Sequence, residues 1–268
     1  MAVLAHAVGW PIPRGGSQAL TNSLCQYLAK FGAKVKTSSR VQTLSALPVY
    51  DLILCDVSPR QLLTLAENRL SDHYRRRLQT YRYGPGVLKV DYALRTPIPW
   101  KASDCSRAAT LHLAGSFEEI AGSEQEVPGG RHADRPFVLL AQPSVLDPSR
   151  APQGKHTAWA YCHVPNGSNT DVLIRLEDQI ERFASGFRDY VVARRVFSPA
   201  DLEKVDANLV VGDIGAESWT SVSFCSDPIE GTTPPRRKIF TSAPHQLRRA
   251  AACTECAAIM QPKWRYQG

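Results

Sequence analysis

A short apolar strand pattern, followed at once by a capped helix, constrains the fold more than any other feature. The run 51–55 is almost continuously apolar and of strand length, which is typical of a buried parallel strand. Ser58, Pro59 and Gln61 then supply an N-cap, a proline at the first helical position and an N3 partner, which predict a helix to about residue 69. A strand that leads directly into a helix indicates α/β organisation.

The segment before this strand predicts the same kind of structure. Gly15 and Gly16 precede an amphipathic run, and Gly32 follows it as a left-handed helix stop. The apolar residues of the run recur at helical spacing: Leu20, Leu24, Leu28 and Phe31. The segments 33–37 and 40–44 are expected to be short strands.

Residues 81–165 contain several strand patterns and few helical ones. A turn at 83–86 precedes a strand pattern at 87–94. Further strands are expected at 108–114, 137–141 and 157–164, with a glycine-rich loop at 121–131. These patterns predict a second, sheet-rich domain, so the whole fold class is α/β combined with α+β.

Two helical patterns follow the predicted sheet. The segment 171–187 has Ile174, Ile180 and Phe183 on one side of a helix, with charged residues elsewhere. Ser198 to Asp201 repeat the cap pattern, with a proline at the first turn and an acid at the third position.

Charge and hydropathy exclude several classes of protein. The net charge of +7 comes partly from the last fifty residues, and the run Arg75–Arg77 is interpreted as a solvated helix face, so nucleic-acid binding is disfavoured. No apolar run is long enough for a transmembrane helix, and the N-terminus is a poor signal peptide. These features suit a cytoplasmic protein. Peripheral membrane contact is compatible with an apolar substrate, although no basic amphipathic helix demonstrates it.

The seven cysteines have no regular spacing. Cys25, Cys55, Cys105 and Cys162 suit reduced thiols. Cys253 and Cys256 have the spacing of a zinc or redox pair, but no second pair accompanies them, so no metal site is expected.

After Ala216 the sequence has the character of a gene translated in another reading frame. Back-translation of 217–228 with permitted codons, read one base out of frame, gives V-M-D-F-R-Q-x-L-F-R-P. The same shift applied to 243–258 gives P-P-G-G-G-V-H-G-M-x-G-Y-N-A-A, a glycine-rich turn leading into a small-residue helix. Residues 217–268 are therefore interpreted as a frameshifted, poorly ordered tail.

Few short motifs in the chain indicate a catalytic or cofactor-binding site. No G-x-G-x-x-G follows a strand, and the chain lacks G-x-S-x-G, H-E-x-x-H and Walker patterns. The Gly15–Gly16 pair could present backbone N–H groups to an anion, but such a pair is more often a tight turn. Asp91 and Asp213 could be general bases, yet nothing raises either above a structural role.

Aromatic and histidine side chains gather at 156–163. Strand alternation would place Trp159, Tyr161 and His163 on one face and His156 on the other. The group could be a redox or aromatic site. The favoured interpretation is an aromatic face that packs the core.

Long particular strings in residues 6–216 resemble the phytoene-desaturase-like group of NAD(P)/FAD-dependent oxidoreductases. They include HAVGWPIPRGGSQAL, YDLILCDVSPRQLL, YRYGPGVLKVDYAL, RPFVLLAQPSVLDPSRAPQGKHTAWAYCHVPNGS, QIERFASGFRDYVVARRVFSPADLE and VGDI. The resemblance implies a flavoprotein with a Rossmann-like dinucleotide-binding domain and an interleaved substrate domain. It also implies a reaction that dehydrogenates or desaturates an apolar, often isoprenoid, substrate by hydride transfer to FAD.

The resemblance also implies positions for the cofactor and the domains. Gly15 and Gly16 match the glycine turn on the flavin side of the substrate cleft. Val41 matches a strand residue near the adenine end of FAD, and Asp56 and Pro59 match the strand end and turn that border the cofactor. No catalytic residue is implied. The implied division assigns 1–70 to a remnant of the FAD-binding domain, 71–195 to the substrate-binding domain and 196–216 to a return to the FAD-binding domain.

The chain departs from the family pattern at both ends. The initial βαβ unit with G-x-G-x-x-G is not seen, and the closing glycine-rich segment is out of frame. The expectation is a fragment that retains no FAD and is inactive alone. Two alternatives stay open: a split subunit that needs a partner chain with the dinucleotide-binding unit, and a non-enzymatic module that binds an apolar ligand.

Overall fold

The structure is a computed structural model that describes residues 7, 11–50, 52–215 and 238–241. The predicted frameshifted tail, with Cys253 and Cys256, lies outside the described residues, apart from the short strand 238–241.

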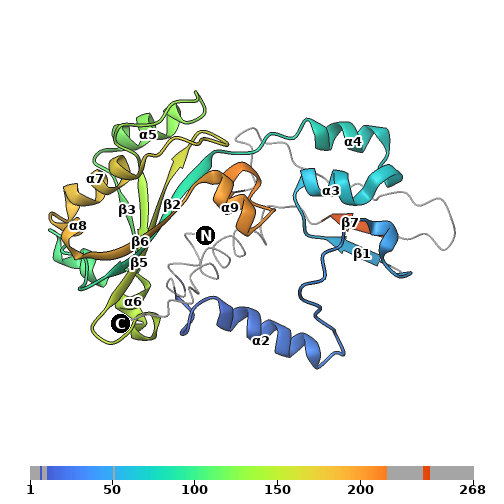
Figure 1. The fold of residues 1–268 in the computed structure, drawn as a ribbon, viewed down its shortest axis with the longest axis horizontal. Helices are drawn as coiled ribbons and strands as arrows, with labels where there is room; N and C mark the ends of the chain where they lie inside the picture. The colour runs from blue at the N-terminus through green and yellow to red at the C-terminus, as the bar shows by residue number, and fades with distance from the viewer. Residues whose placement is uncertain (1–6, 8–10, 51, 216–237, 242–268) are drawn as a thin grey trace.

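A five-stranded antiparallel sheet forms the larger part of the described chain (Figure 1). Its strands are β2 (Gly86–Leu94), β3 (Thr110–Leu113), β4 (Val138–Ala141), β5 (His156–Val164) and β6 (Val191–Phe197), in the spatial order β3-β4-β5-β2-β6. The four strand patterns between residues 87 and 164 are confirmed. The fifth strand, β6, was not predicted and pairs with β2 across about a hundred residues of sequence.

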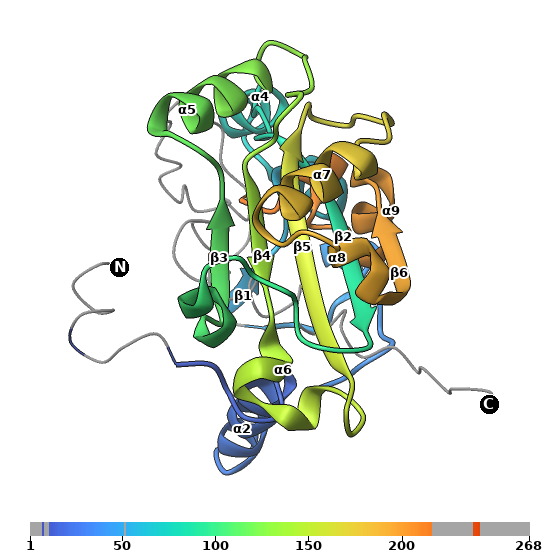
Figure 2. The same cartoon turned by 90° about the vertical axis from the view of Figure 1, so that its left-hand side faces the viewer.

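Two helices cover one face of this sheet. Figure 2 shows α7 (Leu173–Phe183) and α8 (Phe187–Tyr190) in front of its central strands. The even-numbered residues of β2 and β5 point to these helices and pack with Leu176, Ile180 and Phe187 in the main hydrophobic core. Alternation along the strands therefore defines the buried face, as expected for an antiparallel sheet with one covered side.

The helical pattern at 171–187 divides into two helices. Gly186 has a φ of 83° and separates α7 from α8. Ile174, which the pattern places on the same side as Ile180, is 71% exposed, whereas Glu177 is buried. Glu177 forms ion pairs with Arg194 on β6 and Arg188 on α8, which stabilise its buried carboxylate.

The connections between the strands hold short helices. They are η3 (Ser103–Arg107), α5 (Phe117–Glu126), α6 (Pro143–Leu146) and η4 (Pro148–Arg150). The glycine-rich loop predicted at 121–131 was wrong in its first half, because α5 extends to Glu126. Ser116 caps α5 by accepting a hydrogen bond from the backbone N–H of Glu119. This N-cap was not recognised in the sequence because the glycines of the segment favoured a loop.

A smaller α/β cluster lies beside the sheet. It contains β1 (Leu52–Cys55), α3 (Pro59–Ala66), η1 (Leu44–Ala46), η2 (Glu67–Arg69) and α4 (Asp72–Gln79). The predicted capping box is confirmed, since Ser58 and Gln61 exchange side-chain and backbone hydrogen bonds at the start of α3. Strand β1 pairs in parallel with β7 (Lys238–Thr241).

The segment between α2 (Gln18–Ala29) and β1 contradicts one expectation. No strand forms at 33–37 or 40–44, and within the described ranges no hydrogen bond joins residues 34–42 to another backbone group through their own backbone. The described residues place no strand beside these segments, so propensity alone does not order them.

Apolar side chains are exposed on α2 and β1. The helical spacing along α2 is confirmed, and Gly32 ends it with a φ of 77°. Leu24 and Phe31 are 62% and 72% exposed, and Leu54 on β1 is 70% exposed. The burial predicted for β1 was therefore wrong on the side of Leu54, whereas Cys55 is buried.

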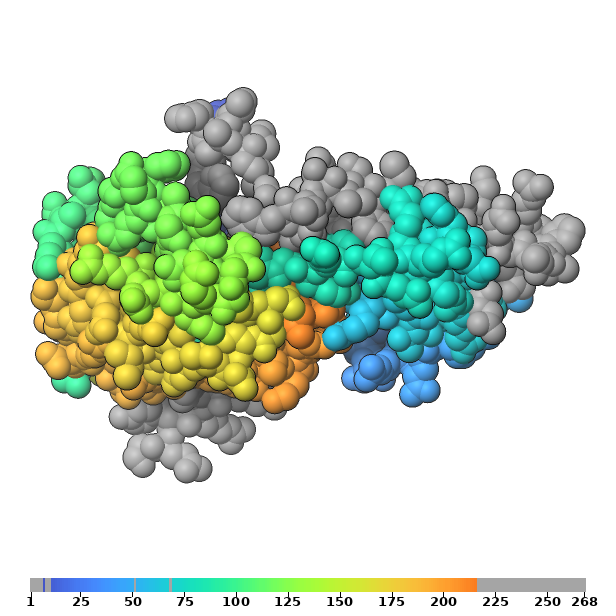
Figure 3. All heavy atoms as spheres, turned by 90° about the horizontal axis from the view of Figure 1, so that it is seen from above, coloured from blue at the N-terminus to red at the C-terminus, as the bar shows by residue number. Residues whose placement is uncertain are grey.

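Residues after β6 join the two parts of the described chain. Helix α9 (Pro199–Val205) and η5 (Val210–Gly212) pack on the sheet through Leu202 and Leu209. Asn208 accepts a hydrogen bond from the backbone of Ser58, and Arg60 forms an ion pair with Glu203. Figure 3 shows α9, in orange, where the two parts meet. The division into domains stays a prediction.

Candidate ligand-binding face

The face of the sheet opposite α7 and α8 carries polar and aromatic side chains. We call it the ligand face and define it by odd-numbered residues of adjacent strands. They are Lys89 and Asp91 of β2, Trp159, Tyr161 and His163 of β5, and Arg195 and Phe197 of β6. Antiparallel register places Lys89 between Tyr161 and Phe197, and Asp91 between Trp159 and Arg195.

A buried cation lies at the centre of the ligand face. Lys89 is 1% exposed, and its ammonium group forms an ion pair with Asp91. The same group lies 5.2 Å from the ring centroid of Phe197 and 5.9 Å from that of Trp159. Desolvation raises the pKa of Asp91, although the charge of Lys89 opposes that rise. A lysine is rarely buried without such a partner.

Three rings follow one another along β5. Trp159 and Tyr161 stack with ring centroids 6.2 Å apart and planes within 7°, and Tyr161 lies 5.8 Å from His163. His163 contacts Glu124 of α5 at 2.7 Å. All three rings are half-buried. The interpretation that this face packs the core is confirmed in part, because Tyr161 packs against the buried cluster of Phe197 and Leu202, although the main core lies on the other side of the sheet. The predicted separation of His156 from these rings is confirmed, and its ring nitrogen lies 3.5 Å from Ser144 on the covered side.

The glycine turn before α2 binds an internal anion. The backbone N–H of Gly15 donates to the carboxylate of Asp147 at 2.7 Å, and Arg150 donates back to the Gly15 carbonyl at 2.8 Å. The N–H of Gly16 donates to the carbonyl of Pro13. Gly16 has a φ of 88°, and a Cβ there would collide with the Arg150 guanidinium, so this position requires glycine. Both N–H groups are therefore engaged within the chain, and the turn does not fit a cofactor phosphate.

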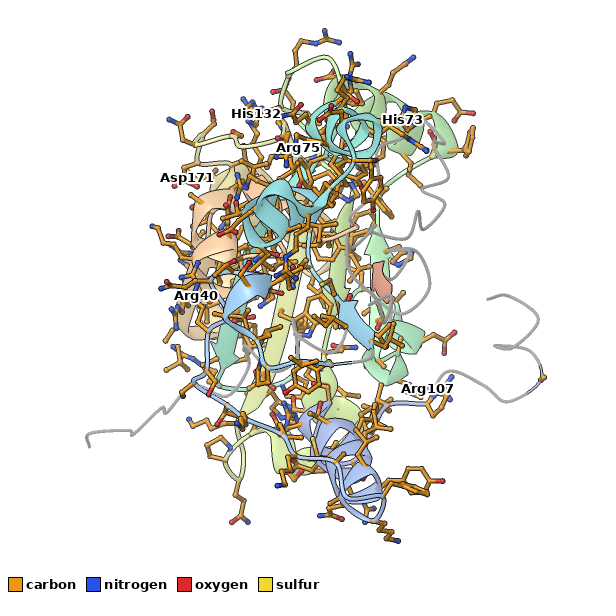
Figure 4. All side chains as sticks on the ribbon, turned by 90° about the vertical axis from the view of Figure 1, so that its right-hand side faces the viewer. Arg40, His73, Arg75, Arg107, His132 and Asp171 are labelled. Carbon is orange, nitrogen blue, oxygen red and sulfur yellow. The ribbon has the colours of Figure 1, made fainter. Side chains whose placement is uncertain are left out.

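The other predicted cofactor residues lie elsewhere. Val41 is on the extended segment between α2 and β1, where Figure 4 labels the neighbouring Arg40. Asp56 follows β1, and Pro59 is the first residue of α3. In Figures 1 and 2 the start of α2 lies beside α6, apart from β1 and α3. The five cofactor positions are thus not brought together, and their role stays a prediction.

The two lone acids have different surroundings. Asp213 accepts hydrogen bonds from the backbone N–H groups of Gly84 and Gly215, which is the structural role expected of it. Asp91 belongs to the ligand face with Lys89. Alternation in the pattern 87–94 could have placed Lys89 and Asp91 together, whereas Arg195 and Phe197 could be found only from the pairing of β6 with β2.

Within the described ranges, no helix combines the length and apolarity needed to cross a bilayer. The four described cysteines, at 25, 55, 105 and 162, are free thiols. Burial raises the pKa of Cys162 to about 12, so this thiol is unreactive at neutral pH.

The overall fold is similar to that of a solved structure. An oxidoreductase from Methanosarcina mazei has a similar fold, with a TM-score of 0.55 and 16% sequence identity over 94% of this chain and 55% of that one. No protein-family model matches the chain.

Two curated relatives share sequence similarity. The rat pyridine nucleotide-disulfide oxidoreductase domain-containing protein 2 is 25% identical over 235 residues, covering 73% of this chain and 40% of that protein. The phytoene desaturase (lycopene-forming) of Pseudescherichia vulneris is 24% identical over 246 residues, covering 77% and 47%. The chain therefore spans less than half the length of these relatives. The chain is thus distantly similar to a phytoene desaturase and to a pyridine nucleotide-disulfide oxidoreductase domain-containing protein, and the resemblance is confirmed.

Proposed function

We propose that the chain is the substrate-binding portion of an FAD-dependent oxidoreductase that dehydrogenates or desaturates an apolar substrate of isoprenoid type. The flavin of such an enzyme accepts the hydride, so the protein contributes binding and orientation. The observation that carries the proposal is the half-buried row of rings on the ligand face, in a chain similar to a phytoene desaturase. Flat rings suit an extended apolar molecule, because stacking and the removal of apolar surface from water both favour contact.

The experiment is a fluorescence titration of the purified full chain with retinol, a neutral isoprenoid probe. We expect saturable binding, because the stacked rings of Trp159 and Tyr161 on the ligand face are only half-buried and leave aromatic surface exposed. Binding that rises linearly with retinol, as in simple partition onto exposed apolar surface, would contradict the proposal.

We further propose that the chain retains no FAD by itself. The N–H groups of Gly15 and Gly16, which were expected on the flavin side, are engaged by Asp147 and Pro13. Each charge-assisted hydrogen bond to a phosphate contributes about 1.5–3 kcal/mol. Without several such bonds to the FAD phosphates, the affinity of the chain for FAD is too low for retention. A chain purified in the presence of FAD and then desalted should show no flavin absorption. A flavin band that co-elutes in proportion to protein would contradict this expectation.

A split subunit is the second candidate. The supporting observation is the exposed apolar stripe on α2, together with the exposed Leu54 of β1, because surfaces of this kind mark protein interfaces. The partner would be a chain that carries a dinucleotide-binding βαβ unit. Co-expression with such a unit should give a complex that retains FAD. Failure of the two chains to co-purify would remove this candidate and leave the retinol experiment untouched.

A further inference from the structure

The charged members of the ligand face are the cations Lys89 and Arg195 and the anion Asp91, while Glu124 of α5 lies beside His163 at the other end of the aromatic row. Lys89 and Arg195 flank the single carboxylate of Asp91, which is opposite Arg195 in the register of β2 and β6. Among the described residues, the guanidinium of Arg195 forms neither a hydrogen bond nor an ion pair. It lies instead 4.6 Å from the ring centroid of Phe197. Within the described ranges, Lys89 and Arg195 thus share the carboxylate of Asp91, and Arg195 has no ion-pair partner of its own.

The surroundings of these cations favour an added anion. An ammonium group has three N–H donors. The buried ammonium group of Lys89 donates a hydrogen bond to Asp91 and lies near the rings of Phe197 and Trp159. A guanidinium group stacked on a ring is weakly hydrated and matches a carboxylate through two parallel hydrogen bonds. A ligand carboxylate at Arg195 would supply this ion-pair partner in a partly apolar setting.

The cationic end of the ligand face leads directly into its apolar part. Asp91 is opposite Trp159, and Trp159 stacks on Tyr161. Across β5, Ala141 is opposite Trp159 and Leu139 is opposite Tyr161. An elongated molecule with its charged end at Arg195 would thus place its apolar body across the two rings and these small and aliphatic side chains.

We propose that the preferred ligand of the ligand face is an apolar molecule that ends in a carboxylate, and that Arg195 binds this carboxylate. The inference rests on the proposed function, since it uses the same face, and it narrows the substrate class from neutral hydrocarbons to anionic amphiphiles. Lys89 holds Asp91 in place and keeps the local charge positive.

The experiment compares retinoate with retinol, which share a polyene and differ at one end. The full chain should bind retinoate about tenfold more tightly than retinol, a difference of one charge-assisted contact. Arg195→Met should reduce this ratio to about one, because Arg195 is exposed and its loss leaves no buried group unpaired. Arg195→Lys keeps the charge and should retain part of the preference.

The matched control is Arg107→Met, which removes an exposed arginine from η3, next to the opposite edge strand β3. It should leave the ratio unchanged, and circular dichroism should show that each variant is folded. Equal affinities of the wild-type chain for retinoate and retinol would overturn the inference while the proposed function stands. An unchanged ratio in Arg195→Met, or an equal loss in Arg107→Met, would overturn it too. Saturable binding of neither probe would remove the proposed function itself.

Discussion

Phe187→Ala is expected to lower the free energy of unfolding by about 4 kcal/mol, since removal of a large buried ring costs transfer energy and leaves a cavity. Phe187 is fully buried between α8 and the sheet, and its ring meets Tyr92 edge to face at 5.1 Å. It closes the covered side of the sheet, so the loss should appear as a lower urea midpoint with an unchanged slope.

Phe117→Ala is the matched control for this measurement. It removes the same side chain from the first turn of α5, where the ring is 78% exposed. The change in stability should stay within about 0.5 kcal/mol. Similar losses for both phenylalanine variants would show that the core is not where the structure places it.

Glu177→Ala is expected to lower the free energy of unfolding by about 3 kcal/mol, the lower end of the cost of breaking a buried ion pair. Its buried carboxylate accepts from Arg188 at 3.1 Å and from Arg194 at 2.7 Å, and it lies 3.4 Å from the Tyr92 hydroxyl. Both guanidinium groups are partly exposed and can regain water, which keeps the cost below that of a fully buried network.

Asp178→Ala is the control that compares the loss of an exposed ion pair with the loss of the buried carboxylate of Glu177. Asp178 also pairs with Arg188, at 2.8 Å, but its side chain is mostly exposed. Its loss should cost less than about 1 kcal/mol. Equal destabilisation by the two variants in urea unfolding would mean that the burial of Glu177 contributes nothing.

Local signals in the sequence predict much of this fold. Ser58 with Gln61 and Ser198 with Asp201 form the two capping boxes that their spacing predicts, because these contacts depend on only four residues each. Alternation along β5 likewise separates a buried face from a half-buried one before any pairing is known, whereas residues 86–90 of β2 are buried on both faces.

Other features depend on contacts that the sequence does not reveal. The patterns at 33–37 and 40–44 form no strand, since the described part of the chain places no strand beside them and Leu44 begins η1. The burial of Glu177 was not predicted, because one of its partners, Arg194, lies on a strand that the sequence did not indicate, and the other, Arg188, follows the break at Gly186. The position of Arg195 on the ligand face was missed for a similar reason, since it approaches Asp91 only through the pairing of β6 with β2.

The most direct measurement compares retinol binding by Trp159→Ala and Phe31→Ala. Trp159 belongs to the ligand face, whereas Phe31 follows the exposed apolar stripe of α2, the competing surface for an apolar probe. Loss of one stacking contact corresponds to about tenfold weaker binding, so Trp159→Ala should bind retinol about tenfold less tightly and Phe31→Ala should bind it unchanged. Weaker binding in Phe31→Ala with unchanged affinity in Trp159→Ala would show that the sheet does not bind the ligand.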